Sequence, residues 1–227
     1  MTETRAGDPR VALVFAGGDL PPARLDERLP RDALVIGADS GIEHALSFGR
    51  HVDVAVGDFD SVAAEVLARA EQAGARVERH PRDKDATDLE LALDLATREG
   101  LTRVTMVGGH GGRLDHFAAN LLLLGAPRFA VLDLDAWFGP AHVTVVRDTA
   151  RVGGPPGSTV SLLALGGRAD GVTTTGLRFP LRDAPLLSGS TLGVSNELDG
   201  PTAEISLRSG VLLVIQPDAL DDERGPR

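Results

Sequence analysis

The chain of 227 residues contains no cysteine. Disulfide bonds, thiolate-bound metals and a cysteine nucleophile are therefore excluded. No apolar run approaches the roughly 18 residues that a membrane span requires, and the polar stretch from Met1 to Arg10 does not resemble a secretory signal. We therefore expect a cytoplasmic protein with no membrane partner.

Positive charge is also scarce. Lysine and arginine total 23 against 33 aspartate and glutamate residues, which gives a formal net charge of -10. A chain of this charge repels nucleic acid as a whole, so we expect no nucleic-acid partner. Any phosphate group must then be bound locally, by arginine, backbone N–H groups or a metal. Lys84 is the only lysine, and it lies in the acidic stretch Asp83-Lys84-Asp85.

Short apolar runs alternate with helical patterns in the first part of the chain. The predicted strands span residues 11–16, 33–36, 52–56, 75–77, 103–107 and 129–132, and the predicted helices span residues 42–48, 62–73, 88–99 and 114–124. This alternation predicts an α/β fold with a mostly parallel, Rossmann-like sheet and flanking helices. Ligands of such folds bind at the carboxyl ends of the strands.

The pattern changes after residue 138 to short β-type runs that are separated by Gly, Pro and Asp clusters. These runs span residues 142–146, 159–165, 171–175, 191–194, 203–207 and 211–215. They predict an antiparallel β module, either a sandwich or a small barrel. We therefore predict an α/β domain over residues 1–138 and a β domain over residues 139–227.

Acidic side chains follow three successive predicted strands. Asp39 follows the second strand, Asp58 and Asp60 follow the third, and Asp88 follows the fourth. Because the carboxyl ends of parallel strands meet at one edge of the sheet, we expect these acids to converge there. Carboxylates so close together repel one another unless a cation lies between them, and a hard divalent metal suits them.

Helix capping is the alternative reading of these acids. Ser61 could cap the helix that follows it, and Thr87 or Asp88 could cap the helix predicted from residue 88. Single caps do not require acids on three neighbouring loops, so the convergence favours a metal.

Two glycine-rich turns follow predicted strands. Gly17 and Gly18 follow the first strand, and the segment 108–112 precedes Arg113, which is a planar donor for phosphate oxygens. A flexible loop is an equally good account of each turn, and a salt bridge or a cap explains Asp115 and its neighbour His116. Together the acids and the turns favour a nucleotide that is held with magnesium.

A Ser195-Asn196 pair stands out in the β module. It offers donors and acceptors to a flat heterocycle, and it is equally typical of an Asx turn in a hairpin.

Four segments in this order resemble the thiamin pyrophosphokinase family. They are Gly57-Asp58-Phe59-Asp60-Ser61, Asp83-Lys84-Asp85-Ala86-Thr87-Asp88, the segment from Gly108 to His116, and Val194-Ser195-Asn196-Glu197. The resemblance spans nearly the whole chain. It implies an α/β catalytic domain joined to a β-sandwich domain, in a homodimer with active sites between the subunits.

The resemblance also implies a reaction. A pyrophosphoryl group would pass from ATP to the hydroxyl group of thiamin, giving thiamin diphosphate and AMP. Asp58, Asp60 and Asp88 would be catalytic and, with Asp39, would hold Mg²⁺ against the phosphates. Ser195 and Asn196 of the partner subunit would bind thiamin. The residues expected around the nucleotide are Gly17, Gly18, Lys84, Thr87, Arg113 and Asp115.

The chain also departs from the family in one respect. Some members place a tryptophan against thiamin in the last strands, whereas residues 210–215 contain none here and the only tryptophan is Trp137. Two other functions stay open at this point. One is a related pyrophosphokinase for another hydroxymethyl heterocycle, such as a pterin, and the other is a noncatalytic sensor that binds nucleotide or thiamin.

Overall fold

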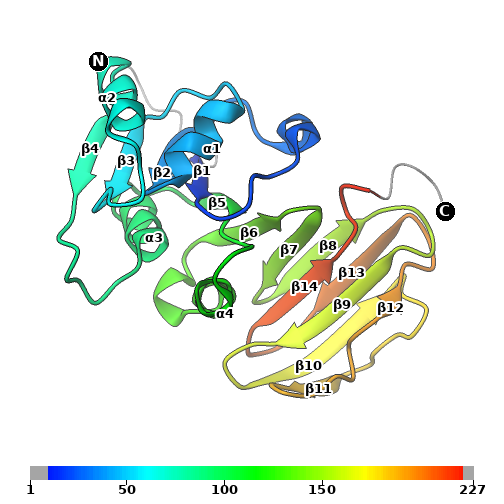
Figure 1. The fold of residues 1–227 in the computed structure, drawn as a ribbon. Helices are drawn as coiled ribbons and strands as arrows, with labels where there is room; N and C mark the ends of the chain where they lie inside the picture. The colour runs from blue at the N-terminus through cyan, green and yellow to red at the C-terminus, as the bar shows by residue number, and fades with distance from the viewer. Residues whose placement is uncertain (1–9, 222–227) are drawn as a thin grey trace, which may run out of the picture.

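The computed structural model of the protein describes residues 10–221, whose strands form two sheets (Figure 1). The larger sheet consists of β1 (Val11–Ala16), β2 (Leu34–Ala38), β3 (Val54–Gly57), β4 (Arg76–Arg79), β5 (Arg103–Gly108), β6 (Asp133–Phe138), β7 (Ala141–Val146), β9 (Thr159–Ala164), β12 (Asn196–Glu197) and β14 (Leu212–Gln216). Its ten strands lie in the order β12-β9-β14-β7-β6-β5-β1-β2-β3-β4. The smaller sheet has the order β11-β10-β13-β8, and it consists of β8 (Thr149–Gly153), β10 (Arg168–Thr175), β11 (Ala184–Leu187) and β13 (Thr202–Ser206).

Strands β1 to β6 are parallel, and β7, β14, β9 and β12 continue the same sheet as antiparallel strands. The predicted α/β class, with a mostly parallel sheet and an antiparallel second part, is confirmed. β1 pairs with β2 on one side and with β5 on the other. The chain leaves β1 toward β2 on one side of the sheet and leaves β5 toward β6 on the other side. The carboxyl ends of β1 and β5 are therefore where such sheets open a crevice for ligands.

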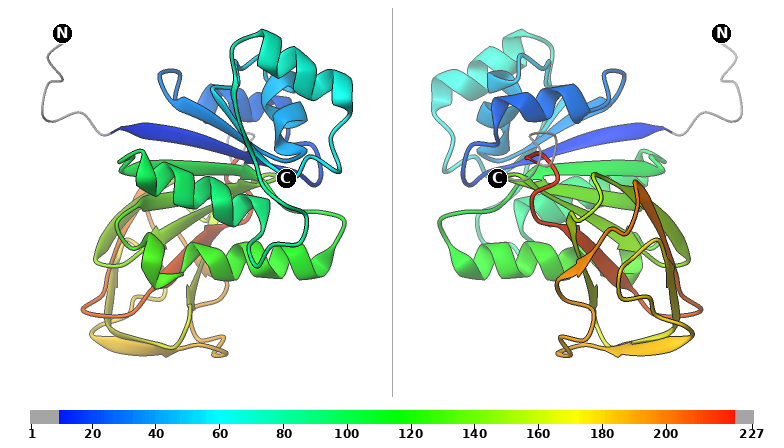
Figure 2. Two further views of the ribbon diagram at one scale, coloured as in Figure 1. Left: turned by 90° about the vertical axis from the view of Figure 1, so that its left-hand side faces the viewer. Right: turned by 90° about the vertical axis from the view of Figure 1, so that its right-hand side faces the viewer.

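Helices cover both faces of the parallel strands (Figure 2). They are α1 (Gly41–Ser47), α2 (Ala64–Gln72), α3 (Asp88–Arg98), α4 (Leu114–Leu124) and the short 3-10 helices η1 (Ala23–Arg28) and η2 (Pro127–Phe129). Alternate side chains of β1 point to opposite faces of the sheet. Leu13 packs in the core beneath α1, α2 and η1, which we call the first core, whereas Val14 packs in the core beneath α3, α4 and η2.

A third core lies between the antiparallel end of the larger sheet and the smaller sheet. It joins Val160 and Leu162 of β9 to Val172 of β10 and Ile205 of β13. The larger sheet runs without interruption across the predicted boundary at residue 138, because β6 pairs with β7. The division into domains 1–138 and 139–227 therefore stays a prediction.

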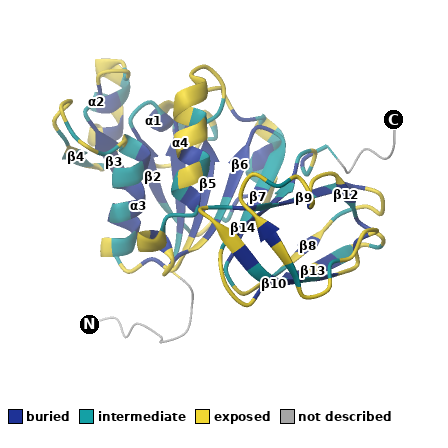
Figure 3. Ribbon diagram, turned by 90° about the horizontal axis from the view of Figure 1, so that it is seen from below, coloured by how far each residue is buried: buried dark blue, intermediate teal, exposed yellow. Residues whose placement is uncertain are grey.

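Helix α4 is unusually exposed for a helix that follows a core strand. Figure 3 shows much of it coloured as exposed, and Leu114 and Leu122 are 78% and 63% exposed. Of its residues only Asn120 and Leu124 are buried.

Two predicted strands are wrong. Residues 129–132 complete η2 and form a turn, and the strand begins only at Asp133. Phe129 and Leu132 are buried side chains of that turn, and an apolar run of this length does not distinguish a turn from a strand. Residues 191–194 also form turns.

β6 and β12 begin only after the predicted runs 129–132 and 191–194, and two further strands, β8 and β11, have no counterpart in the prediction. Each lies at an edge of the smaller sheet and has one buried residue, Val152 in β8 and Leu186 in β11. β8 presents no apolar run, and β11 is apolar but contains Pro185, which argues against a strand. Among residues 10–221, no helix combines the length and the hydropathy that crossing a membrane demands.

Candidate functional site

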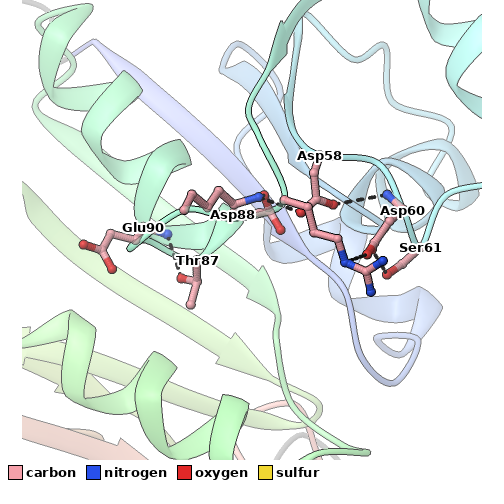
Figure 4. A network of polar contacts seen from close by, with 8 residues as sticks. Asp58, Asp60, Ser61, Thr87, Asp88 and Glu90 are labelled. Carbon is pink, nitrogen blue, oxygen red and sulfur yellow. Dashed lines mark hydrogen bonds and ion pairs between the residues drawn. The ribbon is translucent and has the colours of Figure 1, made fainter.

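Three carboxylates from three connections meet at the carboxyl edge of the parallel strands. Asp39 follows β2, Asp58 follows β3, and Asp88 begins α3. One oxygen from each lies within 4.8 Å of the others. Figure 4 shows Asp58 and Asp88 at this edge, with Asp60 nearby. We call Asp39, Asp58 and Asp88 the acid cluster.

Backbone geometry directs two of these side chains. Phe59 is buried in the first core with a φ of 61°, so its ring anchors the loop while the flanking aspartates leave the core. Asp39 has a φ of 48°. Such conformations cost roughly 1–3 kcal/mol in residues other than glycine and persist where the surroundings impose them, often at functional sites.

Lys84 lies between two of the carboxylates. Its Nζ is 2.8 Å from Oδ2 of Asp58 and 2.7 Å from Oδ1 of Asp88. The side chain of Lys84 is 13% exposed, and those of Asp58 and Asp88 are 14% and 24% exposed. One ammonium group cannot balance three carboxylates, so the acid cluster keeps an excess of negative charge that a divalent cation would neutralise.

The pKa values reflect this imbalance. Burial raises the pKa of Asp39, and the charges of Asp88 and Asp58 raise it further against two opposing hydrogen bonds. The hydrogen bond from Lys84 lowers the pKa of Asp58. Burial by itself would lower the pKa of Lys84, but its bonds to the two carboxylates outweigh burial and raise it.

Asp39 has a side-chain oxygen that no other described residue engages. Its Oδ1 is buried without a hydrogen-bond partner among residues 10–221. Buried polar atoms are seldom left unpaired, because desolvation costs about 1–3 kcal/mol. An oxygen donor of this kind, directed into a group of carboxylates, suits a hard cation.

Asp60 lies outside the acid cluster. Its Oδ2 is 3.2 Å from Nε of Arg82, and both side chains are well exposed, at 41% and 80%. Ser61 donates a hydrogen bond from Oγ to Oδ1 of Asp60 at 3.0 Å. The reading of Ser61 as a helix cap is wrong, because α2 begins at Ala64 and no side chain caps it.

Thr87 is the N-cap of α3. Its Oγ1 accepts a hydrogen bond from the backbone N–H of Glu90 at 3.2 Å. Capping by Thr87 leaves the carboxylate of Asp88 available to the acid cluster. A capping residue and a ligand therefore stand next to each other in the sequence.

The two glycine turns lie side by side where the connections from β1 and β5 diverge. The N–H of Gly109 donates to the carbonyl of Gly17 at 2.6 Å, and the N–H of Asp19 donates to the carbonyl of His110 at 2.8 Å. Gly18 has a φ of 102°, and a Cβ there would lie 2.1 Å from the His110 oxygen. Only glycine fits this approach. We call residues 17–19 and 108–112 the glycine cradle.

Two buried polar residues hold the glycine cradle, and the sequence analysis missed both. Nδ2 of Asn120 donates to the Gly109 carbonyl at 2.8 Å, and Nδ1 of His44 is 2.8 Å from the carbonyl of Ala16. Burial lowers the pKa of His44, which favours a neutral ring that donates from Nδ1. A lone polar residue within the apolar pattern of α4 was the available signal for Asn120.

Arg113 and Asp115 form an exposed pair at the start of α4. Nη2 of Arg113 is 2.6 Å from Oδ2 of Asp115, and the side chains are 70% and 65% exposed. The hydrogen bond from Arg113 lowers the pKa of Asp115 to about 2. Asp115 therefore forms a salt bridge, as one of its two explanations predicted, and the pair is accessible to a ligand.

One cleft of about 590 Å³ joins the acid cluster to the glycine cradle. Its walls include the predicted residues Gly17, Gly18, Asp39, Asp58, Asp60, Thr87, Asp88 and Arg113, together with Arg82, His116 and Asn120. Acids on one wall and backbone turns with an arginine on the other suit a polyphosphate bound with a metal.

Ser195 and Asn196 lie far from this cleft within one chain. β12 is at one edge of the larger sheet, and β3 is next to the opposite edge. Eight strand spacings separate them, or roughly 35–40 Å along the sheet at 4.7–4.9 Å each. The Asn196 amide is also occupied, since Nδ2 donates to the Phe179 carbonyl at 2.7 Å and Oδ1 accepts from the Phe179 N–H at 3.0 Å.

Comparison with known protein families gives two matches. Residues 25–133 match the family described as thiamin pyrophosphokinase, catalytic domain, and residues 144–212 match thiamin pyrophosphokinase, vitamin B1 binding domain.

Individual relatives agree with these family matches. A thiamine pyrophosphokinase of Bacillus subtilis is 31% identical over 191 residues, which cover 81% of this chain and 86% of the relative. The solved structure of thiamine pyrophosphokinase from Bacillus subtilis has 29% identity and a TM-score of 0.80, and the match covers 91% of this chain and 98% of that one. The structure of thiamin pyrophosphokinase from Geobacillus thermodenitrificans has 31% identity and a TM-score of 0.76 over 91% and 96% of the two chains. These matches support the pyrophosphokinase reading over the pterin enzyme and the sensor.

Proposed function

The chain belongs to the thiamin pyrophosphokinase family, and from this premise we propose which of its residues carry out the family's reaction. The reaction transfers the pyrophosphoryl group of ATP to the hydroxyl group of thiamin and yields thiamin diphosphate and AMP. The protein is thus a transferase of thiamin diphosphate biosynthesis. One observation carries the residue assignment, namely the convergence of Asp39, Asp58 and Asp88 beside the glycine cradle.

Magnesium fits the acid cluster. The donors are three carboxylates, and Oδ1 of Asp39 is buried and unpartnered within the described part of the chain. Mg²⁺ takes few carboxylates and shares its remaining positions with phosphate and water. Asp39, Asp58 and Asp88 would hold it, with Asp60 on the cleft wall as the fourth predicted ligand. When bound, it would supply charge neutralisation to the phosphate oxygens.

The glycine cradle and Arg113 would bind the triphosphate. Backbone N–H groups at the start of α4 and the positive end of the helix favour an anion. Arg113 would exchange Asp115 for a phosphate oxygen at little cost, because water screens this exposed ion pair. Catalysis of such transfers depends mainly on positioning and charge neutralisation. The thiamin hydroxyl would attack the β-phosphorus and AMP would leave.

Lys84 would serve two states of the site. Without ligand its ammonium group neutralises part of the acid cluster, at 2.8 and 2.7 Å from two carboxylates. In the loaded site the same group would turn toward the phosphates, since its flexible stem allows this movement. Thr87 would keep the start of α3, and therefore Asp88, in place.

A second copy of the chain would supply the thiamin site. Ser195 lies too far from the acid cluster within one chain, so the two sets of residues can meet only between copies. In a two-fold dimer the α4 end of each copy would meet the β12 end of the other, which closes the assembly.

Exposed apolar side chains support this pairing. Leu114 and Leu122 of α4 are exposed, Leu114 directly after Arg113, and Phe179, Leu192 and Val194 are exposed in the segments around Asn196. Exposed apolar groups of this kind mark interaction surfaces. Changing Leu114 and Leu122 to Asp should convert a dimer to monomers in sedimentation and abolish turnover, whereas Leu20→Asp, at another exposed leucine, should do neither. A wild-type monomer with full activity would contradict the shared site.

The reaction itself is tested by its products. Purified protein with thiamin, ATP and Mg²⁺ should form AMP and thiamin diphosphate in equal amounts, and ADP would contradict the assignment. Asp58→Asn should lower the rate by several orders of magnitude, because an amide cannot replace the charge that holds the metal. Asp85→Asn is the matched control, since Asp85 is exposed in the same region and lies outside the acid cluster. A cytoplasmic location stays a proposal from the sequence.

A further inference from the structure

A second cavity, of about 510 Å³, opens on the larger sheet away from the acid cluster. Its walls share no residue with the cleft described above. They come from strands β5, β6, β7 and β14, from the end of η1, from β8 of the smaller sheet and from Ala219. We call it the junction cavity.

Its position follows from how the sheet is covered. On one face, α1, α2 and η1 cover β1 to β3, and the smaller sheet covers the antiparallel end. Trp137 of β6 belongs to the core under the helices, whereas Val146 of β7 belongs to the core under the smaller sheet. The junction cavity is the gap between these two coverings.

Polar side chains form the floor of this gap. Thr105, Asp135 and Thr144 occupy one row across three strands, and Trp137 and His142 are paired in the next. Oγ1 of Thr105 donates to Oδ1 of Asp135 at 2.8 Å, and Nε2 of His142 is 2.9 Å from Oδ2 of the same carboxylate. Both oxygens of Asp135 are therefore engaged, and its charge is partly compensated.

The rim of the cavity is basic. Arg103 reaches it from β5 and Arg151 from β8, so the two arginines belong to different sheets. Arg28 also lines it. The protein as a whole carries a charge of -10, so arginines gathered around one partly compensated carboxylate make a local exception. Guanidinium groups match the oxygens of phosphate in geometry and charge.

An aromatic wall accompanies this basic rim. The rings of Trp137 and His142 are stacked, with centroids 4.4 Å apart and an interplanar angle of 25°. We infer that the junction cavity binds a small molecule that carries a phosphate group, with Arg103 and Arg151 on the phosphate and the Trp137–His142 pair beside it. This site is separate from the proposed catalytic cleft and does not depend on it.

The composition of the chain provides a direct probe. Trp137 is the only tryptophan, and the chain has no tyrosine. Intrinsic tryptophan fluorescence therefore comes from a single residue in the wall of this cavity. An anion bound beside the stacked His142 ring changes the field at the indole, so binding should change its emission.

The experiment titrates the full-length protein with inorganic pyrophosphate in the presence of EDTA, so that no metal holds the probe at the acid cluster. We expect a saturable change in Trp137 emission at millimolar pyrophosphate, a weaker response to inorganic phosphate and none to acetate. The Arg103→Gln/Arg151→Gln variant should bind at least about tenfold more weakly, since charged hydrogen bonds of this kind each correspond to a factor of ten or more.

Matched variants separate this site from general charge effects and from the cleft. Arg69→Gln/Arg182→Gln makes the same change in net charge at exposed residues outside the cavity, and it should bind as the wild type does. Asp58→Asn, which removes a proposed metal ligand, and Arg113→Gln, which removes a proposed phosphate donor of the cleft, should both keep the fluorescence response while losing turnover. Loss of the response in either variant would place the probe in the cleft. Circular dichroism and thermal melting confirm that each variant is folded.

Three results would overturn the inference. The first is no saturable change in the wild type, and the second is a response that the Arg103/Arg151 variant retains or that Asp58→Asn loses. The third is a change in oligomeric state of the Arg103/Arg151 variant, which would mean that a second copy of the chain covers the cavity.

Discussion

Replacing Lys84 by methionine tests the electrostatics of the acid cluster directly. Methionine keeps much of the length and the apolar stem of lysine but removes the ammonium group that lies 2.8 and 2.7 Å from Asp58 and Asp88. Three carboxylates then face one another without a counterion. We expect the ligand-free variant to be clearly less stable than the wild type.

The size of the effect follows from burial. Removing one partner of a fully buried ion pair costs about 3–5 kcal/mol, and an exposed pair contributes roughly 0–1 kcal/mol. Lys84 and its two partners are between 13% and 24% exposed, so about 2–3 kcal/mol is expected from the interval between these limits. For a chain of this size that corresponds to a fall in Tm of roughly 4–12 °C.

The assay is thermal unfolding of the wild type and the variant in EDTA and in Mg²⁺. Magnesium should raise the Tm of Lys84→Met more than that of the wild type, because it replaces the missing positive charge. Arg82→Met is the matched control. It removes a cation from Asp60 in the same cleft, but that pair is exposed and contributes roughly 0–1 kcal/mol, so Tm should shift by about 4 °C or less. Equal Tm values for Lys84→Met and the wild type in EDTA would refute this account of the cluster.

Three further substitutions test the surroundings of the acid cluster. The pKa of Asp39 is raised in the folded state, so ionisation of this side chain costs stability as the pH rises through that pKa. Asp39→Asn should therefore raise Tm at pH 7 in EDTA, and this gain should vanish on acidification toward pH 4. An unchanged Tm at pH 7 would contradict the reasoning. Asn120→Ala leaves a carbonyl of the glycine cradle unpaired and should cost about 1–3 kcal/mol in denaturant unfolding, with a larger effect on KM for ATP than on kcat; the reverse split would exclude a role in holding the cradle. Gly57→Ala places a Cβ 3.1 Å from Oδ1 of Asp88 and should lower turnover strongly, whereas Gly74→Ala, also at positive φ but with open space around it, should affect stability alone.

The parallel half of the fold was predictable because its signals are local. β1 and α4 have the predicted boundaries, since the apolar run of β1 ends at Gly17-Gly18 and the helical spacing of α4 ends at Gly125. Residues 129–132 were mistaken for a strand because buried apolar side chains in a turn give the same signal. Strand β8 was missed because its sequence has no apolar run, and β11 was missed because Pro185 interrupts its short apolar run.

The continuity of the larger sheet could not be predicted either. It depends on the pairing of β6 with β7, and these two strands lie on opposite sides of the predicted domain boundary at residue 138. The composition changes at that point from helix-rich to β-rich, so the sequence suggests a break where the backbone hydrogen bonds continue.

Within the site, the convergence of acids could be predicted because topology enforces it. Any residue directly after a parallel strand lies at the same edge, whatever its side chain. The partners of those acids depend on side-chain reach and could not be predicted. The sequence of residues 83–88 does not indicate that Lys84 turns back to Asp58. The sequence of α4 likewise does not indicate that Asn120 faces a carbonyl of the glycine cradle.

The use of the only lysine at this position has a physical reason. An ammonium group is a compact charge with three rotatable donors, so it can lie between two carboxylates and follow small movements of either. The ammonium group can also turn away from the carboxylates readily when a cation of higher charge binds, because its hydrogen bonds are not held in a fixed fork. The ligand-free acid cluster can thus keep its geometry around Lys84. In the loaded site that we propose, the same charge would become available to the phosphates, so metal binding and phosphate binding would be coupled through a single side chain.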